Sequence, residues 1–175
     1  MKNKGVIILG SARSNGNTYE IVSFLQKNTG FDCIDLKTKN IGGFDYEFQN
    51  KEDDFLPLLR DIVQKYDTII FATPVYWYAM SGILKHFFDR ISDCLISEKE
   101  LGRQLRGKNM GMVSCGSGPE LKTGFTMPFV ESAHYLGMHY LGDIHTWLEN
   151  DGIPERVKDI VLVFSEEVKI KLKIS

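Results

Sequence analysis

Residues 5–18 read GVIILGSARSNGNT, and this stretch decides the fold class of the chain. Residues 5–10 form a short, continuous and β-branched apolar run closed by glycine, which is typical of a strand buried on both faces of a parallel sheet. The glycines, serines and asparagines that follow are poor helix formers, so they indicate a turn. A helix is then predicted from Asn17 or Thr18 to Asn28, because its apolar residues recur on one face. The chain therefore opens as strand, turn and helix.

Four further strands and four further helices alternate along the rest of the chain. The strands are predicted over residues 31–36, 67–73, 109–114 and 138–141, the last ending at Gly142. The helices are predicted over residues 53–63, 83–91 and 125–136 and from residue 154 onwards. This alternation predicts one α/β domain over residues 1–175, a flavodoxin-like doubly wound five-stranded parallel sheet (order 2-1-3-4-5) with helices on both faces.

Two segments lack a clear periodicity. Residues 37–51 contain Gly42 and Gly43, and a loop of this length is predicted to be a mobile excursion. Residues 97–108 are rich in charge and are predicted to be a solvated connector. Neither segment is assigned a regular element.

Composition and charge exclude several classes of function. The 175 residues include 21 Lys and Arg against 23 Asp and Glu, a formal net charge of −2, which disfavours binding to nucleic acid. Cys33, Cys94 and Cys115 form no CxxC pair and have no histidine at zinc-ligand spacing, so we expect reduced thiols and no metal site. The apolar runs are too short for a signal peptide or a membrane span. We therefore expect a cytoplasmic protein without membrane insertion.

In a doubly wound sheet the ligand lies outside the carboxyl ends of the strands, where the strand order reverses. The loops after Leu9, Thr73 and Ser114 therefore mark the candidate site. The first loop combines backbone N–H groups at a helix start with hydroxyl and amide side chains and with the guanidinium of Arg13, which is a donor set suited to phosphate. A capped turn without a ligand is the alternative, but it gives no reason for Arg13.

The second and third loops suit a flat ring. Tyr76, Trp77 and Tyr78 follow the fixed turn at Pro74, and aromatic faces stack on planar ligands. The alternative is that they belong to the core or to a dimer contact, although three consecutive aromatic residues cannot all face one core. The glycines of the third loop allow close approach of backbone to a ligand.

Other residues whose side chains could act in catalysis have simpler interpretations. Cys115 has no neighbouring base in the sequence, so it is predicted to be a small buried hydrophobic residue and not a nucleophile. The histidines show no shared i, i+4 spacing, and satisfied or surface imidazoles are expected. Arg90 is expected to be solvated or ion-paired. No catalytic side chain is assigned.

The motifs GSxRxxGNT after the first strand and TPVYWYAMSGILKHFFDR after the third resemble those of the NADPH-dependent FMN reductase and NAD(P)H:quinone oxidoreductase families. The match is concentrated in residues 5–18 and 67–92, and it is looser at 113–118. By position, the resemblance implies that the FMN phosphate is held by Ser11, Arg13, Ser14, Asn17 and Thr18. It also implies that the isoalloxazine is lined by Pro74, Val75, Tyr76 and Trp77 and flanked on its other side by Ser114, Cys115 and Gly116.

The same resemblance implies an enzyme that passes a hydride from NAD(P)H to bound FMN and then to a small acceptor such as flavin or quinone. It implies a homodimer, with residues 76–78 and the third helix as candidate contacts. Residues 40–50 contain no cysteine, so the iron–sulfur cluster of one family branch is not expected.

Two alternatives stay open at this point. A flavodoxin-type electron carrier would not oxidise NAD(P)H itself, but such carriers tend to be strongly acidic, unlike this chain. A flavin-free interaction domain would keep the fold and lose the site, and the intact first loop argues against it. No ribose-phosphate pocket can be assigned, so the choice between NADPH and NADH is also open.

Overall fold

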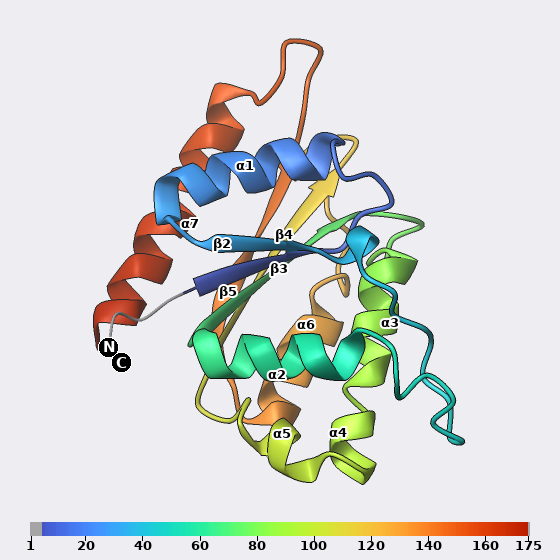
Figure 1. The fold of residues 1–175 in the computed structure, drawn as a ribbon. Helices are drawn as coiled ribbons and strands as arrows, with labels where there is room; N and C mark the ends of the chain where they lie inside the picture. The colour runs from blue at the N-terminus through green and yellow to red at the C-terminus, as the bar shows by residue number, and fades with distance from the viewer. Residues whose placement is uncertain (1–4, 175) are drawn as a thin grey trace.

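The computed structural model describes residues 5–174, which fold around one parallel sheet (Figure 1). The strands are β1 (Gly5–Leu9), β2 (Asp32–Asp35), β3 (Thr68–Pro74), β4 (Asn109–Gly116) and β5 (His139–Trp147). Their order is β2-β1-β3-β4-β5 and every neighbouring pair is parallel. The predicted sheet order is thereby confirmed.

Helices cover both faces of the sheet, as predicted (Figure 1). The helices are α1 (Asn17–Thr29), α2 (Phe55–Lys65), α3 (Gly82–Arg90), α4 (Asp93–Ile96), α5 (Lys99–Arg103), α6 (Met127–Leu136) and α7 (Glu155–Ile174), with a 3₁₀ turn at Leu36–Thr38. The apolar sides of α1 and α7 pack on one face, and those of α2, α3 and α6 pack on the other. Among residues 5–174, no helix is long and apolar enough to cross a membrane.

The central strand β1 shows why the first apolar run is continuous. Val6 and Ile8 point into the core shared with α2 and α3, whereas Ile7 and Leu9 point into the core shared with α1 and α7. All four side chains are fully buried, because successive side chains of a strand face opposite sides and both sides are covered here. Each such side chain contributes about 1.5–3 kcal/mol through burial.

The last strand is longer than predicted. Gly142 was expected to end it, but β5 continues to Trp147. The register between β4 and β5 shifts at Met110/Gly111, and Gly142 has a φ of 115° at this irregularity. Glycine thus accommodates a bulge inside the strand, because only glycine adopts such a φ without strain. The extension places His145 directly beside Ser114.

The predicted solvated connector over residues 97–108 is partly wrong. It contains the short helix α5, and Leu101 and Leu105 are buried in the same core as the apolar side of α2. The charged residues that dominate the sequence of this segment occupy only its outer side.

The segment over residues 37–51 is more restrained than the sequence predicts. Near its beginning it is joined to the N-cap of α2, where the Asp54 carboxylate accepts a hydrogen bond from the Asn40 N–H at 2.7 Å. Its middle is held by the guanidinium of Arg90, which donates to the carbonyl oxygens of Gly42 and Asn50 at 3.3 and 3.1 Å. The loop is therefore attached to α3.

Candidate cofactor site

The turn after β1 presents backbone donors at the start of α1. The N-cap residue of this helix is Gly16, and within the described residues no side chain caps its first N–H groups. The hydroxyl oxygen of Ser11 accepts a hydrogen bond from the Arg13 N–H at 3.3 Å, which closes the turn on itself. Uncapped N–H groups and the positive end of the helix dipole together favour an anion at this position.

The side chain of Arg13 lies beside these donors. It is exposed, and a Cβ atom added to Gly16 would lie 3.2 Å from its Nε. The guanidinium stem therefore lies against the backbone of Gly16 at the helix start. Ser14 is half-buried and Asn17 is exposed in the same turn.

Thr18 differs from the other residues predicted to hold phosphate. Its side chain is 3% exposed and lies close enough to the Cys115 thiol to influence the pKa of that group, so it is turned towards the sheet. Only the backbone of Thr18 therefore lies among the N–H donors at the start of α1. Its assignment as a phosphate ligand stays a prediction.

The loop after β3 contains a strained hairpin turn. Tyr76 and Ala79 exchange two backbone hydrogen bonds of 3.0 Å, and between them Trp77 and Tyr78 have φ values of 48° and 64°. This is the pattern of a type I′ turn, which ordinarily selects Asn and Gly. A non-glycine residue in the left-handed region costs about 1–3 kcal/mol, and such strain clusters at functional sites.

The three aromatic residues of this loop point away from the core. The exposed fraction is 43% for Tyr76, 92% for Trp77 and 68% for Tyr78. The alternative that they are core residues is therefore wrong. Large apolar rings held at the surface by a strained turn are suited to contact a planar ligand or another protein surface.

Backbone hydrogen bonds bring the three predicted loops together. The Gly10 N–H donates to the carbonyl oxygen of Ala72 at 2.8 Å, and the Val75 N–H donates to that of Cys115 at 2.9 Å. Pro74 and Cys115 lie opposite each other in the β3–β4 register. The predicted ring-binding residues are thus neighbours at the carboxyl edge of the sheet.

A hollow of about 480 Å³ opens between the second and third loops. We call it the strand-end hollow. Val75 and Tyr78 line it from the second loop, residues 116–122 line it from the third, and Phe125 completes it. Its volume lies in the range of small-molecule sites in proteins.

Two polar residues that the sequence did not single out connect these loops. Ser81, at the N-cap of α3, donates from its hydroxyl to the carbonyl oxygen of Gly10 at 2.7 Å. His145 on β5 contacts Ser114 and Gly118 through its two ring nitrogens. The sequence does indicate a helix cap at Ser81, because this serine precedes an apolar helical stripe. The hydrogen-bond partners of Ser81 and His145, however, lie far away in the sequence.

Cys115 has the character that was predicted for it. Its side chain is 4% exposed, and burial raises the pKa of the Cys115 thiol above its ordinary value, partly offset by hydrogen bonds with Thr146 and Thr18. A thiol held protonated is a poor nucleophile. Cys115 therefore packs as a small buried residue of β4 in the core that it shares with α1.

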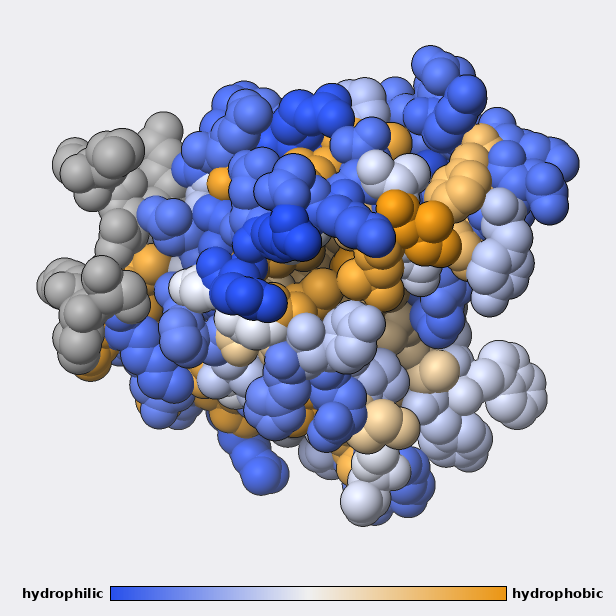
Figure 2. All heavy atoms as spheres, turned by 90° about the horizontal axis from the view of Figure 1, so that it is seen from below, coloured by the Kyte–Doolittle hydropathy of each residue, from blue (hydrophilic) through white to orange (hydrophobic). Residues whose placement is uncertain are grey.

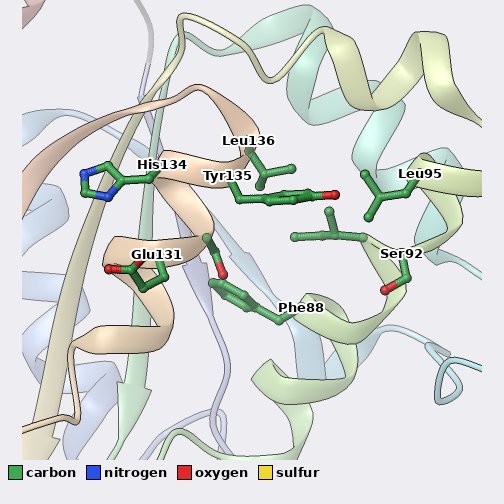
Figure 3. A pocket seen from close by; sticks show the side chains of 9 residues that line it. Phe88, Ser92, Leu95, Glu131, His134, Tyr135 and Leu136 are labelled. Atoms are coloured by element: carbon green, nitrogen blue, oxygen red, sulfur yellow. The ribbon is translucent and has the colours of Figure 1, made fainter.

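A second, larger hollow lies away from the strand ends, between the C-terminal half of α3 and α6. This α3–α6 groove has a volume of about 620 Å³ and is lined by Phe88, Ile91, Ser92, Leu95, Glu131, Ser132, His134, Tyr135 and Leu136. Figure 3 shows the Tyr135 ring reaching across from α6 towards Leu95. Figure 2, which views the molecule from the side of α4 and α5, shows apolar side chains exposed in a hollow among hydrophilic ones. The sequence did not predict this groove.

Comparison with known proteins establishes the family. The family model for NADPH-dependent FMN reductase matches residues 3–152. The chain belongs to the NADPH-dependent FMN reductase family. It is 30% identical over 154 residues, 79% of this chain and 82% of the other, to YwqN of Bacillus subtilis, which is named as an NAD(P)H-dependent FMN-containing oxidoreductase. It is 26% identical over 170 residues, 89% of both chains, to an FMN-dependent NADPH-azoreductase of Staphylococcus haemolyticus.

Solved structures agree with the flavodoxin-like fold. The Trp repressor binding protein from Bacillus subtilis superposes with a TM-score of 0.72 at 25% identity, covering 93% of this chain and 96% of that one. The apo form of the NADH:FMN oxidoreductase EMOB superposes with a TM-score of 0.71 at 15% identity, covering 97% and 89%. The family model and the two relatives identify the chain as an FMN-dependent NAD(P)H oxidoreductase, so the enzyme class predicted from its sequence motifs is confirmed.

The residues at the carboxyl edge fit FMN in this structure. The uncapped start of α1, with Arg13 beside it, suits a phosphate, and the strand-end hollow between two loops suits a flat ring. The phosphate turn follows β1 and the hollow lies between the loops after β3 and β4, so both features lie at the carboxyl ends of neighbouring strands, beside the point where the strand order reverses.

Proposed function

We propose that the first loop holds the FMN phosphate and that the second and third loops hold its ring. The phosphate would accept hydrogen bonds from the N–H groups at the start of α1 and from Ser11 and Ser14, with Arg13 as its counter-charge. The ring would lie between the backbone of Pro74–Trp77 and that of Ser114–Gly116. The uncapped helix start beside Arg13 is the observation that carries this assignment.

We further propose that the electron acceptor is a small flat molecule, such as a quinone or a free flavin, that enters the strand-end hollow and stacks on the FMN ring there. Val75, Leu121 and Phe125 give this hollow an apolar lining. The charges nearby cancel, because Lys122 and Glu120 form an ion pair of 3.0 Å. An uncharged planar ring therefore matches the hollow better than a strongly charged acceptor does.

This chain's own residues act by binding and orientation. Bound FMN supplies the redox chemistry, in which NAD(P)H, a proton and a quinone yield NAD(P)⁺ and a hydroquinone. The strained turn at Trp77 and Tyr78 fixes the backbone of the second loop in one conformation. Because this conformation is already formed before the ring binds, little conformational entropy of the loop is lost on binding.

The test is an anaerobic absorbance experiment on the purified protein, supplemented with FMN and desalted. We expect flavin bands that co-elute with the protein, bleach on addition of NADPH or NADH, and return on addition of a naphthoquinone. Bleaching without return would overturn the quinone assignment. Retained flavin that neither nicotinamide bleaches would favour the electron carrier, and absence of retained flavin would overturn the phosphate site.

We also propose that the protein is a homodimer whose interface includes the second loop and the α3–α6 groove. Two observations support this proposal: Trp77 and Tyr78 are largely exposed, and the α3–α6 groove presents Leu95 and Tyr135, which are 43% and 74% exposed. Sedimentation velocity should give a dimer at micromolar concentration. The double variant Leu95→Glu/Tyr135→Glu should sediment as a monomer, whereas a monomeric wild type with full activity would contradict the proposal.

Finally, we propose the cytoplasm as its location. The described cysteines are free thiols, which suits a reducing compartment. Fractionation of the source cells should recover the protein with the cytoplasmic enzymes.

A further inference from the structure

The imidazole of His145 links the sheet to the third loop of the site. Ser114 and His145 lie opposite each other in the β4–β5 register. His145 Nδ1 lies 2.8 Å from the Ser114 hydroxyl oxygen, and Nε2 lies 2.9 Å from the carbonyl oxygen of Gly118. One ring therefore spans from a strand to a loop that lines the strand-end hollow.

The partners of this ring define its tautomer. A carbonyl oxygen only accepts, so Nε2 carries the proton and donates to Gly118. In the neutral ring Nδ1 is then an acceptor, and the Ser114 hydroxyl donates to it. The other acceptor near this hydroxyl, the Ile144 carbonyl oxygen, is farther away at 3.4 Å. Both ring nitrogens thus have a specific bond.

The ring also supports the loop sterically. A Cβ atom on Gly116 would lie 2.8 Å from His145 Cε1 and 3.1 Å from Nε2, so the imidazole lies directly against the Gly116 backbone. The ring of Trp147, which is 7% exposed, is a further neighbour at a centroid distance of 6.4 Å. The imidazole is therefore held between buried structure and the loop.

Few other bonds restrain this loop. In the described part of the chain, the bond from His145 is the only side-chain hydrogen bond received by the backbone of residues 117–121. These residues are half-buried or exposed and belong to no helix or strand. Apart from the packing of Leu121 on the core, His145 is therefore the side chain that holds the backbone of this wall of the hollow.

We propose that His145 is a positioning residue that sets the shape of the strand-end hollow through Gly118 and thereby determines how well the acceptor binds. This inference rests on the proposed function of the hollow. His145 itself acts on the loop and not on the reacting atoms. His145 also contacts Ser114 and Gly116, which the proposed function places beside the FMN ring, so FMN affinity should fall together with acceptor binding when this loop is displaced. The phosphate turn on β1, two strands away from β4, should keep its own contacts.

Three substitutions separate the two hydrogen bonds. His145→Gln places an amide N–H near the position of Nε2 and retains the bond to Gly118. His145→Asn places its amide near the position of Nδ1, so it retains only the contact with Ser114. His145→Phe keeps a ring and removes both bonds. His139→Gln, at an exposed position of the same strand, is the matched control.

The readouts are the FMN dissociation constant and the KM and kcat for a naphthoquinone at saturating NADPH. We expect His145→Asn and His145→Phe to raise the quinone KM about fivefold, the size of effect that loss of one hydrogen bond produces. The FMN dissociation constant should also rise in the Asn and Phe variants, whereas His145→Gln should keep the KM and the FMN dissociation constant within about twofold of the wild type. Equal KM values in the Asn, Gln and Phe variants would overturn the proposal.

An NMR measurement tests the positioning without an activity assay. Side-chain ¹⁵N shifts of His145 should show a protonated Nε2 and an unprotonated Nδ1. Amide shifts of residues 117–121 should move in the Asn and Phe variants and stay in place in the Gln variant. If the wild type fails to reduce the quinone while these shifts behave as expected, the proposed acceptor is wrong and the positioning role is supported. Unchanged shifts in all variants would refute the positioning role.

Discussion

The hydroxyl of Ser81 donates a hydrogen bond to the carbonyl oxygen of Gly10 at 2.7 Å, which ties the start of α3 to the turn after β1. The same hydroxyl oxygen accepts from the Leu84 N–H at 3.1 Å, and the Ser81 N–H donates to the hydroxyl oxygen of Thr73 at 3.0 Å. Ser81 is 1% exposed. One buried serine therefore caps a helix and joins the predicted phosphate turn to the predicted ring loop.

Replacing this serine should weaken both the fold and FMN binding. Ser81→Ala removes the helix cap and leaves the Gly10 carbonyl oxygen without its bond, which should lower the free energy of unfolding by about 1–3 kcal/mol. Urea unfolding and FMN titration measure the two effects. Ser92→Ala is the control, because Ser92 precedes α4 without a side-chain cap bond; an equal loss of stability in the two variants would contradict the prediction.

Arg13→Ala should weaken FMN binding with little change in the fold. The side chain is exposed and lies at the start of α1, so its loss removes charge from the phosphate position without opening the core. We expect the FMN dissociation constant to rise about tenfold or more, as for the loss of a charge-assisted hydrogen bond. Arg103→Ala makes the same charge change on α5 and should have no effect. Unchanged FMN affinity in Arg13→Ala would refute the phosphate assignment.

Arg90→Met should destabilise the protein strongly. The guanidinium is 2% exposed, donates to Asp93 at 2.9 Å and to Asp53 at 2.5 Å, and lies 5.0 Å from the ring centre of Phe55. Burial opposes the charge, but the hydrogen bonds to Asp53 and Asp93 outweigh it and raise the pKa of Arg90.

Removing the cation leaves two carboxylates buried without their partner, at a cost of about 3–5 kcal/mol in the free energy of unfolding. The loop over residues 40–54 should also become more sensitive to protease, because Arg90 holds Gly42 and Asn50. Lys85→Met breaks the exposed pair with Asp89 and should cost less than about 1 kcal/mol. Urea unfolding compares the two, and similar losses would disprove the special role of Arg90.

The cysteines of the folded protein should resist alkylation at pH 8. Burial raises the pKa of the Cys33 thiol to about 11, with a smaller contribution from Asp35, and burial raises that of Cys94 to about 12. Because the thiolate is the reactive form and its fraction grows with pH, labelling by iodoacetamide should accelerate about tenfold per pH unit while the fold persists. Mass spectrometry measures the labelling. Unfolding in urea should expose all three thiols at once, and equally fast labelling of native and unfolded protein would contradict the prediction.

Much of the fold was predictable because its signals are local. The apolar run over residues 5–10 identifies a strand buried on both faces, and the polar turn after it identifies the start of α1. The predicted end of the last strand at Gly142 was wrong, because a glycine in a sequence is equally compatible with a strand end and with a bulge. Leu101 and Leu105 were missed because the charged residues around them hide a short helix that tertiary packing buries.

The chain sequence by itself determined the order of the elements, the family and the three loops that meet at the carboxyl edge, because these follow from periodicity and from contiguous motifs. Only the tertiary structure decided that Ser81 reaches Gly10, that Arg90 holds a distant loop and that His145 supports Gly118. Each of these bonds joins residues far apart in the chain. Their geometry depends on strand register and on the bulge at Gly142, which no local pattern records.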